Sequence, residues 1–151
     1  MRIHFVCRGN AYRSRMAEAY MRAYHPDVEV TSSGTCADAH RAENDPELIS
    51  FTDDFLRRQG VDVAMKQHPS QLTADRLQSD DFVICMNQLV ASEFVALLPH
   101  PPVYETWDIA DTGETSATVA AGLGVEAHTK AIYKEIVANC ERLLTTGLIH
   151  R

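Results

Sequence analysis

Near its N-terminus the chain reads Cys7-Arg8-Gly9-Asn10-Ala11-Tyr12-Arg13-Ser14, between an apolar run at 3–6 and a helical pattern at 16–21. This order predicts a buried strand, a tight loop and the first turn of a helix. The loop opens with a thiol, closes with a guanidinium six positions later, and is followed by a hydroxyl. Such spacing allows backbone N–H groups to surround a tetrahedral oxyanion, while the helix N-terminus adds its positive dipole end. The stretch therefore predicts a phosphate-binding loop.

The side chains of this loop indicate a chemical role. The positive potential favours the thiolate form of Cys7, which makes it a nucleophile near neutral pH. Arg13 can bind two phosphate oxygens at once through its planar guanidinium, and Gly9 and Asn10 readily adopt the left-handed angles of a tight loop. The alternative interpretations are a buried core cysteine and a solvated arginine, although a cation at a helix start opposes the helix dipole. The residues expected to line the phosphate are Arg8, Gly9, Asn10, Ala11, Tyr12, Arg13 and Ser14.

Composition limits the class of protein. The 151 residues are 45% apolar and suit one globular domain over 1–151. The formal charge of −7 argues against nucleic acid as a partner. We expect no membrane association, because no apolar run approaches the roughly 20 residues of a spanning helix and no signal-peptide pattern opens the chain.

The cysteines indicate the redox compartment, and the histidines bear on metal binding. The four cysteines, Cys7, Cys36, Cys85 and Cys140, are far apart and show no metal or redox spacing. A disulfide framework is not expected, and we interpret the chain as a protein of the reducing cytoplasm. The seven histidines are scattered, so no metal site is predicted. Cys85 and Cys140 are interpreted as core residues, and Cys36 as the other thiol near the loop.

The rest of the pattern alternates strands and helices. Strands are predicted at 2–6, 28–31, 82–86 and 103–105, and helices at 14–24, 45–60, 73–77, 88–98 and 129–145, with Gly34 as a turn and irregular segments at 36–44 and 107–124. Alternation of this kind predicts an α/β fold: a three-layer sandwich with a four-stranded parallel sheet and helices on both faces. Its site would lie beyond the C-terminal strand ends, where Cys7 follows the first strand and Asp111 the fourth.

The segment Val6–Glu18, VCRGNAYRSRMAE, resembles the loop of the low-molecular-weight protein tyrosine phosphatases, Val-Cys-x-Gly-Asn-x-Cys-Arg-Ser-Pro-x-Ala-Glu. Further stretches at 31–35, 80–86 and 107–112 resemble other segments of that family. The resemblance implies a cysteine-dependent phosphatase that hydrolyses protein phosphotyrosine, or small aryl phosphates, through a phosphocysteine and without a cofactor.

The resemblance also implies roles for further residues. Ser14 would donate a hydrogen bond to the thiolate, and Asn10 and Ser32 would support the loop. Asp111 takes the place of the general acid, although Thr112 replaces the proline that usually follows it. Asp108, three residues earlier, is the alternative acid.

Three residues in or next to the loop also depart from the family pattern. Tyr12 stands where many members carry a second cysteine, Arg15 replaces a proline and is interpreted as a surface arginine, and Arg8 lies on the rim of the pocket. These changes leave other functions open.

A protein arginine phosphatase is one alternative. The residue at position 11, Ala11, does not distinguish phosphoarginine from phosphotyrosine as the substrate. A weakly catalytic phosphoprotein-binding module is another. An arsenate reductase is disfavoured, because Ser92 stands where its second cysteine would follow Cys85.

Overall fold

The computed structural model describes residues 2–40, 45–110 and 124–146. Within these residues, four strands form one parallel sheet in the order β2-β1-β3-β4. Their bounds are β1 Arg2–Cys7, β2 Glu29–Gly34, β3 Phe82–Cys85 and β4 Tyr104–Thr106. The helices are α1 Arg13–Tyr24, α2 Ala37–His40, α3 Asp45–Arg58, the 3-10 helix η1 Ala74–Arg76, α4 Gln88–Leu97 and α6 Val125–Thr145.

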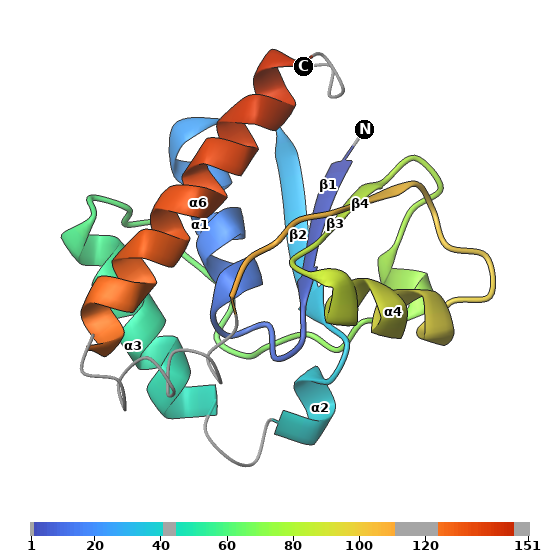
Figure 1. Ribbon diagram of the computed structural model, residues 1–151, viewed down its shortest axis with the longest axis horizontal. Helices are drawn as coiled ribbons and strands as arrows, with labels where there is room; N and C mark the ends of the chain where they lie inside the picture. The colour runs from blue at the N-terminus through green and yellow to red at the C-terminus, as the bar shows by residue number, and fades with distance from the viewer. Residues whose placement is uncertain (1, 41–44, 111–123, 147–151) are drawn as a thin grey trace.

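The helices cover both faces of the sheet. Helices α1, α3 and α6 lie on one side, and α4 lies on the other (Figure 1). The strands run parallel, so their C-terminal ends meet at one edge, the lower edge in Figure 1, close to α2. This confirms the predicted α/β fold with a loop directly after β1.

Alternation along β1 explains why both faces are covered. Ile3 and Phe5 point into the larger core beneath α1 and α6, whereas Val6 belongs to the smaller core beneath α4. All three side chains are fully buried, as expected for the inner strand of a parallel sheet. The phosphate-binding loop therefore begins at the end of a buried inner strand.

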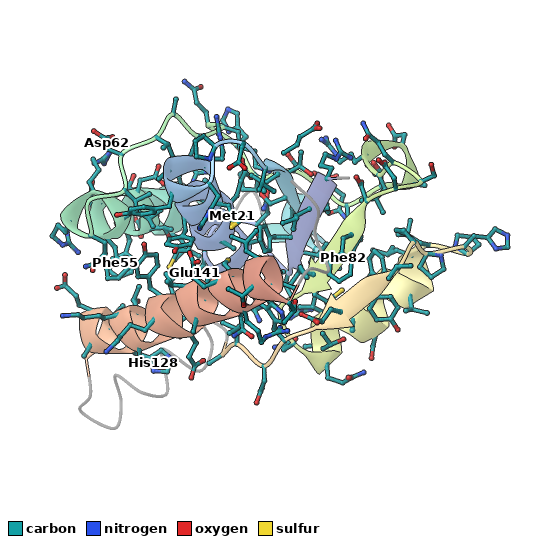
Figure 2. The ribbon with its side chains drawn as sticks, turned by 90° about the horizontal axis from the view of Figure 1, so that it is seen from above. Met21, Phe55, Asp62, Phe82, His128 and Glu141 are labelled. Carbon is teal, nitrogen blue, oxygen red and sulfur yellow. The ribbon has the colours of Figure 1, made fainter. Side chains whose placement is uncertain are left out.

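Helix α6 closes the larger core. Phe55 points from α3 toward α6 (Figure 2), where its ring meets that of Tyr133 with centroids 5.6 Å apart. Glu141 of α6 accepts hydrogen bonds from Tyr20 and, at 2.7 Å, from His25. Within the described part of the chain, no helix has the length and apolar content needed to cross a membrane.

Several boundaries differ from the sequence-based prediction. The second strand continues to Gly34, so this glycine ends a strand and is not a turn. The segment after it contains the short helix α2, and the last helix begins at Val125 rather than at 129. Cys85 and Cys140 are fully buried, as predicted.

Candidate active site

The predicted loop lies between the end of β1 and the first turn of α1. Residues after β2 hold its first half in place, because Thr35 N donates to Cys7 O and Cys36 N donates to Arg8 O, both at 2.9 Å. At Gly34 the end of β2 and the loop come so close that an added Cβ would lie 2.4 Å from Arg8 O. Only glycine fits this approach.

Asn10 organises the loop. Its φ of 59° is left-handed, as predicted, whereas Gly9 is not among the glycines of positive φ. The backbone N–H of Asn10 donates to Cys7 Sγ at 3.1 Å. Its side-chain Nδ2 donates to Ser14 Oγ at 2.8 Å and to Ser32 Oγ at 2.9 Å, and Oδ1 accepts from Ser70 N at 2.9 Å. The asparagine is fully buried, so these bonds fix its conformation.

The Cys7 thiol faces two donors. Ser14 Oγ lies 3.0 Å from Cys7 Sγ. Because Ser14 already accepts a hydrogen from Asn10 Nδ2, its own hydroxyl hydrogen is available to the sulfur. The loop thus offers a thiolate both a backbone N–H and a hydroxyl.

A second group of polar side chains lies behind Ser32. Ser32 Oγ donates to Glu18 Oε1 at 2.5 Å, and Lys66 Nζ lies 3.2 Å from the same hydroxyl. Glu18 is only 6% exposed. Burial lowers the pKa of Lys66 to about 8, although the nearby Glu18 opposes this shift.

Arg13 is 1% exposed at the start of α1, and its Nη1 donates to Ile109 O at 3.0 Å. Ile109 N in turn donates to Met86 O at 2.9 Å, so the segment after β4 runs along the strand ends. Asp108 is exposed on this segment. Asp111 and Thr112 lie outside the described residues.

The rim of the loop carries an ion pair. Arg8 Nε and Nη2 each lie 3.1 Å from a carboxylate oxygen of Glu93 on α4. Thr35 donates to the same carboxylate at 2.8 Å, and Cys36 Sγ is 3.6 Å from it. Burial alone would raise the pKa of Glu93, but the hydrogen bonds from Arg8 and Thr35 hold it below its usual value. Arg8, which we expect on the rim of the pocket, is therefore held by Glu93 of α4.

The interpretation of Arg15 as a surface residue is wrong. Its side chain is only 2% exposed and forms two hydrogen bonds with Asp53 of α3, at 2.8 and 3.0 Å. The sequence could not indicate this buried ion pair, because Asp53 lies 38 positions away on another helix.

The departure at Tyr12 is also explained by packing. The Tyr12 hydroxyl meets Thr129 Oγ1 of α6 at 2.6 Å, and the ring is 3% exposed. Next to it, Thr52 of α3 donates to Ala11 O at 2.9 Å. Side chains from α3 and α6 thus hold the second half of the loop.

Sequence reasoning missed several contributors to the site, namely Glu18, Gly34, Thr52, Asp53, Lys66, Ser70 and Glu93. Of these, Glu18 carried a usable signal, because it follows Ser14 by one helical turn and so shares its face. Among the described residues, no group of three or more histidine, cysteine, aspartate or glutamate side chains could hold a metal ion.

Solved structures with this fold include phosphatases. Wzb of Vibrio vulnificus, solved with benzylphosphonate, is 18% identical with a TM-score of 0.77, covering 96% of this chain and 97% of that one. A low molecular weight protein tyrosine phosphatase from T. tengcongensis is 25% identical with a TM-score of 0.71, covering 97% and 99%. The YwlE arginine phosphatase of Geobacillus stearothermophilus is 24% identical with a TM-score of 0.63, covering 99% and 97%.

Among curated proteins, no sequence relative is found. The family model described as low molecular weight phosphotyrosine protein phosphatase, however, matches residues 2–146. The chain therefore belongs to the low molecular weight phosphotyrosine protein phosphatase family, and it is a phosphatase.

Proposed function

We propose that Cys7 is the nucleophile with which this protein hydrolyses phosphotyrosine in proteins, and small aryl phosphates, through a phosphocysteine. The observation that carries the proposal is the placement of Cys7 Sγ at the end of β1, where Asn10 N and Ser14 Oγ both approach within 3.1 Å. Donors aimed at the sulfur stabilise its anionic form, which is the form that attacks phosphorus.

In the first step the Cys7 thiolate attacks phosphorus, an S–P bond forms, and the bond from phosphorus to the tyrosine oxygen breaks. The backbone N–H groups of residues 8–14 and the Arg13 guanidinium stabilise the charge on the three equatorial oxygens. Ile109 orients Arg13 for this role through the bond from Nη1 to its carbonyl. In the second step water attacks phosphorus and the S–P bond breaks, while Ser14 donates to the departing sulfur.

The leaving tyrosine oxygen needs a proton, and the attacking water must then lose one. We assign both transfers to Asp111, which follows Ile109, the residue that accepts the hydrogen bond from Arg13, by two positions in the sequence. Asp108 is the alternative acid, since it directly precedes Ile109 in the sequence and is exposed.

The first experiment measures steady-state hydrolysis of p-nitrophenyl phosphate. Cys7→Ser is expected to abolish turnover but to keep phosphate binding, because backbone groups form the loop. Cys36→Ser is the matched control, because it removes the other thiol near the loop and should keep turnover. The Sγ of Cys36 contacts Arg8 and Glu93. Substantial turnover by Cys7→Ser would contradict the assignment. Comparing phosphotyrosine and phosphoarginine peptides then separates the two substrate classes.

The second experiment identifies the acid. Asp111→Asn is expected to slow substrates with poor leaving groups far more than activated aryl phosphates, because only the former need the proton. Equal losses for both types, or a larger loss from Asp108→Asn, would show that Asp111 is not the acid.

A further inference from the structure

The ammonium group of Lys66 lies against the residues that support the loop. Its Nζ is 2.7 Å from Ser32 O, 3.2 Å from Ser32 Oγ and 3.2 Å from Ser70 Oγ. These three contacts match the three hydrogens of a protonated lysine. Both serines also contact Asn10, through Ser32 Oγ and Ser70 N.

The contacts of Ser32 fix the direction of its hydroxyl group. A hydroxyl has one hydrogen and two lone pairs. Here the hydrogen is donated to Glu18 Oε1, and the lone pairs face Lys66 Nζ and Asn10 Nδ2. A protonated lysine can only donate to Ser32, whereas a neutral amine could also accept the Ser32 hydrogen and so compete with Glu18 for it.

The same order continues to the nucleophile. When Ser32 accepts from Asn10, the amide of Asn10 is held with Nδ2 toward both serine hydroxyls and Oδ1 toward Ser70 N. Ser14 then also accepts from Asn10 and directs its hydrogen to Cys7 Sγ. As long as Lys66 is charged, Ser32 cannot donate to it, so the Ser32 hydroxyl accepts from both Lys66 and Asn10 and donates to Glu18.

We propose that Lys66 is a positioning residue for catalysis, which acts through Ser32 and Asn10 to keep the Ser14 hydroxyl directed at Cys7. The proposal rests on the proposed phosphatase function and adds a residue that does not itself touch the substrate.

The charge of Lys66 depends on pH in an accessible range. Burial lowers its pKa to about 8; Glu18 of α1 and Cys7 oppose this shift, whereas Arg15 of α1 and Arg76 of η1 add to it. The cavity of about 520 Å³ around Lys66 is also lined by the charged side chains of Arg2 and Asp75 and by His4. Because the folded-state pKa is about 8, the positioning effect is present below that pH and is lost above it.

The test compares kcat for p-nitrophenyl phosphate between pH 6.5 and pH 9.5. At pH 6.5, Lys66→Met is expected to be about tenfold slower than wild type, the usual effect of losing a charge-assisted hydrogen bond. By pH 9.5 the two enzymes should converge to within about twofold, because wild type has then lost the same charge. Lys66→Arg should stay faster than Lys66→Met throughout, since a guanidinium remains protonated.

Two controls separate the proposed route from simpler effects. Lys134→Met removes an equal charge from the exposed face of α6 and should leave kcat unchanged. In a Ser32→Ala background, Lys66→Met should cost less than about twofold, because the route through Ser32 is already broken. A full tenfold loss in that background, or a wild-type to Lys66→Met ratio that does not change with pH, would overturn the proposal.

Binding of tungstate to the loop, measured by calorimetry, repeats the comparison without turnover. If wild type fails to hydrolyse aryl phosphates while the tungstate affinities follow the same pattern of variants and pH, the proposed function is wrong, and Lys66 positions the anion-binding loop without a role in catalysis. If neither measurement shows the pattern, the role of Lys66 is wrong.

Discussion

Gly34 determines how closely β2 can approach the phosphate-binding loop. An added Cβ would lie 2.4 Å from Arg8 O and 2.9 Å from Asn10 N, both of which are backbone atoms. Gly34→Ala must therefore push the loop away from the strand, and overpacking of this kind costs about 1–3 kcal/mol. We expect a lower unfolding free energy together with weaker phosphate binding.

Gly9→Ala is the matched control for this prediction. No atom lies within 4 Å of a Cβ built on Gly9, so the unfolding free energy should stay close to that of wild type. Denaturant titration of both variants makes the comparison. Wild-type stability and phosphate affinity in Gly34→Ala would show that the approach is not as close as described.

Helix α3 acts as a support for the loop and for the first turn of α1. Its Asp53 neutralises Arg15, whose side chain is 2% exposed, while Asp54 pairs with Arg57 at the surface. Asp53→Asn leaves a buried cation without its countercharge and should cost about 2 kcal/mol of unfolding free energy.

Asp54→Asn tests the same helix without the buried partner. The Asp54 side chain is 59% exposed, and surface pairs of this kind contribute less than about 1 kcal/mol. Denaturant titration of both variants at neutral pH checks the difference. Equal effects of the two substitutions would mean that Arg15 is not buried as described.

The whole molecule should be sensitive to acid because of His4. Its ring nitrogens contact Thr31 Oγ1 at 2.5 Å and Ser33 Oγ at 2.7 Å between β1 and β2. Burial lowers the pKa of His4 to about 3. The unfolded chain has an ordinary histidine pKa of about 6.5, so it binds the proton first as the pH falls.

The resulting contribution to stability is complete above pH 6.5 and is lost progressively as the pH falls toward 3. At pH 4 the loss should be about 3 kcal/mol relative to pH 7. Denaturant titrations of wild type and His4→Gln across this range measure it, with exposed His100→Gln as the control. The prediction fails if wild type and His4→Gln lose stability in parallel.

The fold could be predicted from the sequence because its signals are local. The buried run of β1, the loop and the amphipathic start of α1 follow one another within 24 residues. The supports of the site could not be predicted in this way. Ser70 contacts Asn10 from 60 positions away and Lys66 contacts Ser32 from 34, and no periodicity records such pairs.

The same limit of sequence-based prediction applies to single residues. A glycine next to a loop motif suggests a turn, and only the three-dimensional approach of β2 to Arg8 reveals why Gly34 is needed. A charged residue at a helix start suggests a surface, and only the position of α3 reveals the buried pair of Arg15 with Asp53.

The central claim is that Cys7 carries the phosphoryl group during turnover. The most direct measurement is rapid acid quenching of the enzyme during hydrolysis of an aryl phosphate, followed by mass spectrometry of the peptide that contains Cys7. We predict that this peptide gains the mass of one phosphoryl group in wild type, and that no peptide does so in Cys7→Ser. Turnover without a phosphorylated Cys7, or a phosphoryl group on another residue, would contradict the account.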